Sequence, residues 1–390
     1  MKASNYFAIT GLFLFAACAS TQTGNNATPS TPALGEEYSS VPENEARLAP
    51  VISQMFQGIV KAGYETRKNT ADQRPARRDA HAKHHGCVAA QFTVEKNLPA
   101  DWKVSLFGTP ASYKAIIRFS NGDFTPKDDR LGDAHGMAVK VLGVSGEKLL
   151  NSGDANGETD TQDFVMIDNR VFFMRKPETY VPFVQAELKG PEGIKEWAAQ
   201  NPYEFALIQG TVHKKPDSPL GVQYWSQTPY KLGSKAMKFT ARPCAGSKAS
   251  SIPLKQRHEN YLKDTLKKNL ASKAACFDFY LNLQTDAVKT PVEDPTIEWP
   301  ETVDGKSTLI KVATINIPVS KNATSDASMR LCEDLSFSPW HGLTTLQPLG
   351  GVNRIRKLVY IEASKLRHSL NQAPFPAVGE AEWNKLLSGK

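Results

Sequence analysis

The 390-residue sequence is poor in the features that mark several common classes of protein. Its five cysteines show no C-x-x-C spacing, and no G-x-G-x-x-G follows a strand pattern, so neither a zinc module nor a dinucleotide-binding unit is predicted. The net charge of +7 comes from scattered lysines and arginines, without a long basic run or interleaved aromatic residues, which argues against a nucleic-acid partner. We also find no internal repeat and no apolar stretch long enough for a permanent membrane span.

The N-terminus has the pattern of an export signal. Lys2 precedes an uncharged stretch, residues 6–17, that is rich in Phe, Leu and Ala. Small residues directly before Cys18 are typical of a bacterial lipoprotein, in which this cysteine becomes the lipidated first residue. The rival interpretation is cleavage after Ala19, within an A-x-A pattern. We expect a signal peptide over residues 1–17 and a lipoprotein anchored on the periplasmic side of a bacterial cell envelope.

The segment after Cys18 consists mainly of Thr, Ser, Asn, Gly and Pro up to residue 40. Such a composition does not bury enough apolar surface to fold, so we predict a flexible tether over residues 18–41. From residue 42 the composition is that of a globular protein, with enough residues for one large or two small cores. We expect one domain over residues 42–372, followed by a polar tail over residues 373–390.

Four further cysteines belong to the predicted mature chain. Export permits disulfide bonds among them, and four cysteines allow three pairings that the spacing does not distinguish. They are Cys87, Cys244, Cys276 and Cys332.

The hydrophobic pattern changes its period along the chain. Apolar residues spaced by three and four predict helices over residues 42–65, 177–189, 191–209, 256–272 and 353–371. Shorter runs of β type are predicted over residues 113–120, 136–142, 163–167, 276–284 and 307–317. Strands and helices do not alternate strictly, which favours an α+β fold with a largely antiparallel sheet.

The last predicted helix has a polar face. Four residues share it because they lie at i, i+4, i+8 and i+11: Arg356, Tyr360, Ser364 and Arg367. An arginine one turn from a tyrosine favours the ionised phenol, and a phenolate is a hard anionic donor that suits ferric iron. The alternative interpretation is a surface helix with ordinary polar residues.

A histidine cluster lies near the start of the domain, at His81, His84 and His85. No H-E-x-x-H pattern accompanies it, which argues against a zinc site. A single histidine held over a cofactor could instead act as general base and acid between two oxygens. The alternative is a turn with exposed histidines.

Taken together and in order, the motifs of this chain resemble those of the catalase superfamily, in particular the small catalase-like haem proteins of bacteria. The resemblance extends from about residue 78 to residue 368. The motifs are Arg78-x-x-His81-Ala-Lys, Arg118-Phe-Ser, Gly136-Met-Ala-Val-Lys, Asn169 followed by Phe172-Phe173, and Arg356-x-x-x-Tyr360 with Arg367.

The resemblance implies a role for each matched residue. His81 would be the distal acid and base, and Asn169 would supply a distal amide, although it stands closer to the phenylalanine pair than the family pattern has it. Tyr360 would be the iron ligand, Arg356 its charge partner, and Tyr180 an aromatic ring above the haem. Three arginines would hold the haem propionates, because a guanidinium matches a carboxylate bidentately: Arg78, Arg118 and Arg367.

The resemblance also implies the cofactor, the fold and the activity. We expect haem b, with its iron, between a closed antiparallel β-barrel and flanking helices, without the C-terminal flavodoxin-like domain of large catalases. The expected activity is that of a catalase- or peroxidase-like oxidoreductase, which cleaves hydrogen peroxide or organic peroxides and uses an electron donor. The protein could act as a monomer or as an oligomer. The alternatives are a lipid hydroperoxide isomerase of the allene oxide synthase type and a non-catalytic haem-binding envelope lipoprotein.

Overall fold

A computed structural model describes residues 31–247 and 249–388 of the chain. The predicted export signal and Cys18 lie outside these residues. Within the described residues, no helix is both long enough and apolar enough to cross a membrane.

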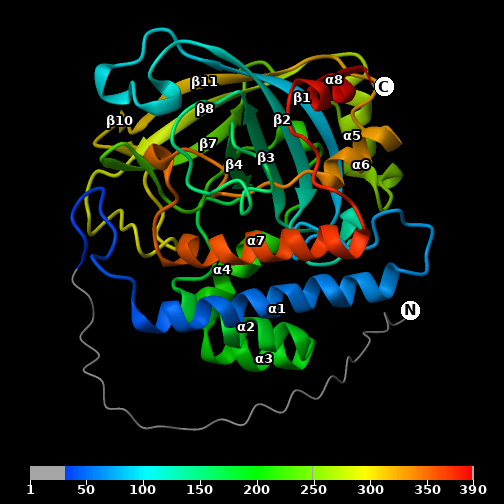
Figure 1. Cartoon of the computed structure of the whole chain (residues 1–390), viewed down its shortest axis with the longest axis horizontal. Coiled ribbons are helices and arrows are strands. Elements are labelled where there is room, and N and C mark those ends of the chain that lie inside the picture. The colour runs from blue at the N-terminus through cyan, green and yellow to red at the C-terminus, as the bar shows by residue number, and fades with distance from the viewer. Residues whose placement is uncertain (1–30, 248, 389–390) are drawn as a thin grey trace.

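Eight antiparallel strands close into a barrel (Figure 1). Around the barrel they follow the order β5 (Tyr224–Trp225), β4 (Thr161–Ile167), β3 (His135–Leu142), β2 (Ser112–Asn121), β1 (His84–Val94), β11 (Leu309–Ile317), β8 (Ala275–Leu283) and β7 (Lys235–Pro243). A pairing of β5 with β7 joins the two ends of the sheet. The short β6 (Tyr230–Leu232) pairs with β7 in antiparallel register. Outside the barrel, β9 (Thr302–Val303) pairs with β10 (Lys306–Ser307). The expected α+β fold with a closed antiparallel barrel is thereby confirmed.

Aromatic side chains fill the inside of the barrel. The alternation that predicted β8 places Phe277, Phe279 and Leu281 on its inner face, and all three are fully buried. The ring of Phe164, from β4, lies 4.9 Å from that of Phe279 and 5.1 Å from that of Phe239 on β7. Because side chains occupy the interior, a cofactor site has to lie outside the barrel wall.

Helices cover the outside of the barrel. Their bounds are α1 (Glu43–Arg67), α2 (Tyr180–Leu188), α3 (Pro191–Gln200), α4 (Pro202–Val212), α5 (Tyr261–Leu270), α6 (Asp326–Asp334), α7 (Gly351–Asn371) and α8 (Glu380–Ser388). Figure 1 shows α7 and α1 side by side below the barrel, with α2 and α3 beyond α1. Where α1, α2 and α7 meet, their apolar faces form a second core that includes Phe56, Phe183 and Val359.

Two expected elements differ in detail from the structure. The helix predicted over residues 191–209 is divided into α3 and α4, because Pro202 lacks an N–H group and restricts the conformation of Asn201 before it. The strand predicted over residues 307–317 is likewise divided at Thr308, between β10 and β11.

The predicted polar tail contains a packed helix. In α8, Leu386 is 1 % exposed and packs with Cys87 and Cys332 in a small apolar cluster, while Trp383 Nε1 donates to the carbonyl of Ala90 on β1 at 2.8 Å. The polar residues of α8 make its short apolar face difficult to recognise in the sequence. The packed part of the chain therefore continues past residue 372 into α8.

Two disulfide bonds select one of the three possible pairings. Cys244 pairs with Cys276, and the bond joins the end of β7 to β8. Cys87 on β1 pairs with Cys332 on α6, across 245 residues of sequence. The second bond ties α6 to the barrel wall beside the predicted site.

Candidate active site

A cavity with two connected lobes lies between the barrel and the helix layer. The first lobe has an empty volume of about 830 Å³, and the second about 1370 Å³, open solvent at their mouths included. Both lobes are lined by His81 from the loop before β1, by Met166 on β4 and by Tyr360 on α7. Two of the residues predicted to face each other across a cofactor therefore line one cavity.

Tyr360 lies on the face of α7 that borders the cavity. Nη2 of Arg356, one helical turn earlier, donates to its Oη at 2.9 Å. The other end of the guanidinium donates to Asn353 Oδ1 at 3.0 Å, and Thr228 Oγ1 donates to the same oxygen at 3.1 Å. Burial alone would lower the pKa of Arg356, but the neighbouring phenol of Tyr360 raises it above its ordinary value. Arg356 is thus a permanent cation that is fixed on the phenol oxygen.

His81 lines the same cavity from the loop before β1. Its backbone has φ +57°, a conformation that L-residues rarely adopt, and its Nδ1 lies 3.0 Å from Ser120 Oγ on β2. A Cβ on Gly136 would approach both His81 Nδ1 and Ser120 Oγ to 2.7 Å, so this close arrangement requires glycine. Burial lowers the pKa of His81 to about 3, and Arg118 acts in the same direction, so the imidazole is neutral at pH 7.

Three arginines border the first lobe. Arg118, on β2, is 3 % exposed, and its Nη2 donates to the carbonyl of His81 at 2.7 Å, whereas its Nε has no partner among the described residues. Burial lowers the pKa of all three, that of Arg367 to about 9 and that of Arg118 well below its ordinary value. Arg78 and Arg367 lie close enough to Arg118 to add to this effect. The lobe thus gathers more buried positive charge than the surrounding protein compensates.

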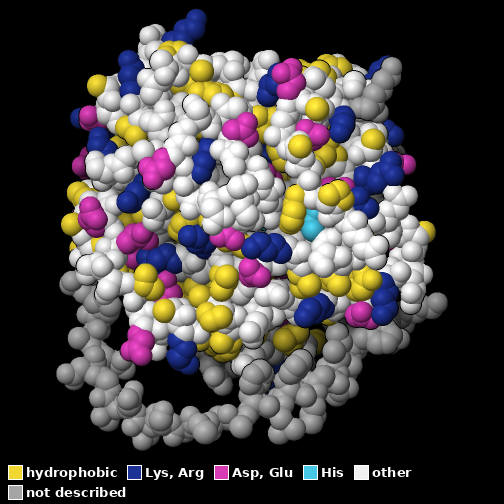
Figure 2. All heavy atoms as spheres, in the orientation of Figure 1, with side chains coloured by type: hydrophobic (Ala, Val, Ile, Leu, Met, Phe, Trp, Pro, Cys, Tyr) yellow, Lys and Arg dark blue, Asp and Glu magenta, His cyan; other side chains and the backbone are white. Residues whose placement is uncertain are grey.

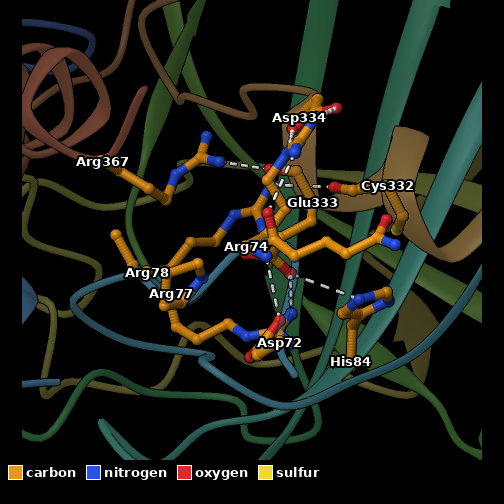
Figure 3. A network of polar contacts seen from close by, with 12 residues as sticks. Asp72, Arg74, Arg77, Arg78, His84, Cys332, Glu333, Asp334 and Arg367 are labelled. Carbon is orange, nitrogen blue, oxygen red and sulfur yellow. Dashed lines mark hydrogen bonds and ion pairs between the residues drawn. The ribbon is translucent and has the colours of Figure 1, made fainter. Parts of the chain in front are cut away.

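Glu333 at the end of α6 organises these arginines (Figure 3). It is 1 % exposed and accepts from Arg78 Nη1 at 3.0 Å and Arg77 Nη1 at 3.1 Å, and its Oε2 lies 3.2 Å from His84 Nε2. Backbone carbonyls next to it also accept: that of Glu333 from Arg367, and that of Cys332 from Arg78 at 3.1 Å. One carboxylate and the end of one helix therefore fix two of the three arginines.

The structure separates Asn169 from the other predicted residues. It is absent from the lining of both lobes; its Nδ2 donates to the carbonyl of Val171 at 2.9 Å, and Lys214 Nζ lies 3.4 Å from its Oδ1. A buried amide that does line the second lobe is that of Gln227, whose Nε2 also donates to Val171. Tyr180 lines the second lobe, in edge contact with Phe56 at 6.3 Å between ring centroids.

Several residues of the site were not predicted from the sequence. Ser120 lies two residues after Arg118 on β2 and so faces the same side, a signal that strand alternation contains. Gly136 lies within a matched motif, but only the structure reveals the two atoms that exclude a side chain there. Glu333 carries no local signal, because its partners are distant in sequence. Asn353 accepts from Arg356, three residues later, and also from Thr228, which is distant in sequence.

A buried ionic cluster lies next to the first lobe. Glu158, Asp163 and His341 have ligand atoms close enough to hold a metal ion. However, Lys140 Nζ already pairs with Glu158 and lies 2.7 Å from Asp163 Oδ1. The lysine of the Gly136-Met-Ala-Val-Lys motif thus supplies the cation of this cluster.

Comparison with known proteins supports the architecture. No protein-family model and no curated protein sequence matches the chain. Among solved structures, a fungal catalase aligns with a TM-score of 0.59 and 17% identity, over 90% of this chain and 68% of its own. Catalase A from Saccharomyces cerevisiae aligns with a TM-score of 0.55 and 18% identity, over 92% of this chain and 72% of its own. The protein therefore has a catalase-like fold.

Proposed function

We propose that this protein is an oxidoreductase that binds haem b between His81 and Tyr360 and cleaves the O–O bond of peroxides. The observation that carries the proposal is that these two side chains line one cavity, each with a dedicated partner. The catalase-like fold supports peroxide chemistry at the level of the fold family.

The residues present fit a haem group. The surplus of buried positive charge around Arg78, Arg118 and Arg367, with the unpartnered Nε of Arg118, suits the two propionates of a haem. Tyr360 offers a phenol oxygen that Arg356 already touches, as an anionic iron ligand requires. When bound, haem iron would supply the redox chemistry of peroxide cleavage.

The neutral imidazole of His81 would move the proton. Because Nδ1 is engaged with Ser120, Nε2 is the nitrogen available to the peroxide. In this scheme Nε2 takes a proton from one peroxide oxygen and returns it to the other oxygen, which leaves as water or an alcohol. Ser120 and Arg118 would hold the ring in place through its Nδ1 and through the backbone carbonyl of His81.

Spectra and kinetics of purified protein with adequate haem supply test this function. We expect a high-spin ferric spectrum with a phenolate charge-transfer band, which Tyr360→Phe abolishes at nearly constant side-chain volume. His81→Ala should retain haem and lower peroxide cleavage by roughly 10²-fold or more. Protein that binds haem but neither evolves oxygen nor oxidises a phenolic donor above free-haem rates would refute the enzymatic proposal. Haem that passes readily to apomyoglobin would then favour a carrier.

We also propose that the protein acts at the periplasmic side of a cell envelope, anchored by lipid at Cys18. The support is the export pattern of the sequence, together with disulfide bonds that suit an oxidising compartment. Fractionation of Cys18→Ser cells tests the anchor, since loss of the thiol should release the protein from the membrane.

A further inference from the structure

The second lobe of the cavity is mostly apolar and extends well away from the arginines. Its wall includes Phe56 on α1, Phe183 on α2 and Ile208 on α4, together with the stacked pair Phe172 and Phe173, whose ring centroids lie 4.8 Å apart. It still reaches His81 and Tyr360 at its inner end. The helix layer thus adds a hydrophobic chamber in front of the two residues to which the proposed function assigns the chemistry.

The two lobes share part of their lining. His81, Met166 and Tyr360 line both, so a haem bound between His81 and Tyr360 would occupy space in each lobe. Phe183 and Ile208 line the second lobe alone. An organic substituent of a substrate would contact this apolar wall, which hydrogen peroxide, a small polar molecule, does not need.

Charged groups with a negative balance border the same lobe. Lys127 Nζ lies 2.8 Å from Asp123 Oδ2 and 3.6 Å from Asp133 Oδ2, so one cation is shared between two carboxylates. Glu187, an exposed residue of α2 that also lines the lobe, adds a third carboxylate near Asp123 and Lys127. Burial raises the pKa of Asp133 to about 6, which still leaves it ionised at neutral pH. With Asp79 and Arg356, which also line the lobe, four carboxylates thus face two cations.

We propose that the apolar lobe selects uncharged organic hydroperoxides with an alkyl or aryl substituent, and that the acidic residues beside it disfavour hydroperoxides that carry a carboxylate. This inference rests on the proposed peroxide-cleaving function and names its substrate class. In the balanced reaction the O–O bond of ROOH breaks, two electrons and two protons come from two molecules of a phenolic donor, and ROH and water form. A free fatty-acid hydroperoxide, which carries a carboxylate, is the disfavoured case.

The experiment compares cumene hydroperoxide with its ring-carboxylated analogue, on the holoprotein, with a phenolic donor. We expect kcat/KM to favour the uncharged substrate by at least tenfold at low ionic strength, and the preference to shrink as salt is added, because salt screens charge and leaves apolar contact intact. Glu187→Lys should shift the ratio toward the carboxylated substrate by about five- to tenfold. The matched control Glu196→Lys, an exposed residue of α3 outside both lobes, should leave both rates unchanged.

A second variant tests the apolar lobe itself. Ile208 is half-buried, so Ile208→Trp should fill space in the lobe without loss of the fold. We expect it to lower kcat/KM for cumene hydroperoxide at least fivefold while the rate with hydrogen peroxide changes less than twofold. Equal kcat/KM for both organic substrates in wild type, or equal losses for organic and hydrogen peroxide in Ile208→Trp, would overturn the inference while leaving peroxide cleavage intact. No turnover of any peroxide would instead refute the proposed function.

Discussion

At the scale of single residues, the position of His81 depends on an absent side chain. Gly136 leaves the space in which the imidazole of His81 and the hydroxyl of Ser120 meet, and any Cβ there would come to 2.7 Å from both. The sequence pattern Gly-Met-Ala-Val-Lys does not by itself indicate this steric requirement for glycine. The position of the proposed acid and base therefore depends on contacts among His81, Ser120 and Gly136, which are far apart in the sequence.

Gly136→Ala should displace His81 without removing it. Because the new methyl group excludes the present contact, we expect roughly 10²-fold slower peroxide cleavage, similar to His81→Ala, with haem still bound. Gly58→Ala on α1 is a matched control, since a Cβ there meets nothing within 4 Å. Stopped-flow kinetics per bound haem measures the effect, and an unaltered rate in Gly136→Ala would contradict the assigned geometry.

The imidazole of His81, which is half-buried, also links stability to pH. Burial lowers the pKa of His81 from 6.5 to about 3, so between these values the unfolded chain binds a proton that the folded chain does not. The folded state therefore loses stability as pH falls through this window, by up to about 1.4 kcal/mol per pH unit. In haem-free protein, wild type should lose about 2 kcal/mol more than His81→Asn between about pH 6.5 and pH 4.5. Urea unfolding at both pH values measures this, and parallel losses would argue against a buried neutral His81.

At the scale of elements, α6 connects the disulfide bond to the arginines. Cys332 is bonded to β1, its carbonyl accepts from Arg78, and the next residue, Glu333, accepts from Arg77 and Arg78. A loosened α6 would release these arginines from their fixed positions. The bond between Cys244 and Cys276 joins the end of β7 to β8, and neither strand carries any of these arginines.

A double variant, Cys87→Ala with Cys332→Ala, should therefore weaken the binding of carboxylates in the first lobe. We expect about tenfold lower affinity for protoporphyrin IX, but a smaller change for its dimethyl ester, which lacks the two charges. The variant Cys244→Ala with Cys276→Ala controls for the general effect of losing a disulfide. Equal losses for the free acid and the ester would show that the bond supports the fold and not the arginines.

The sequence predicted more of the elements than of their packing. Period-two runs located five of the eight barrel strands, and period-3.6 runs most helices, because burial on one face leaves a local pattern. The strands β1, β5 and β7 were not predicted. The short apolar face of α8, with Trp383 and Leu386, was missed because five of its nine residues are polar. Asn169 was assigned by motif order alone; in the structure its amide donates to Val171, and the residue lies outside the lining of both lobes.

At the scale of the whole molecule, the site joins the two ends of the domain. Arg78 and His81 precede the first barrel strand, whereas Tyr360 and Arg367 lie on the last long helix. The barrel itself contributes Arg118, Ser120, Gly136 and Met166. The barrel is thus a rigid spacer whose closure brings the two end segments to one cavity.

This arrangement has a consequence for folding kinetics. In the reduced chain, His81 and Tyr360 come together only after the long segment between them has folded into the barrel. Contacts between residues so distant in sequence form slowly. The bond between Cys87 and Cys332 bypasses 245 residues, so in the oxidised chain the two end segments are already neighbours before any strand has paired. Stopped-flow refolding should accordingly be faster for oxidised than for reduced protein, and haem added during refolding should be captured earlier. The same bond would keep both halves of the site in one molecule after a protease had cut the chain between them.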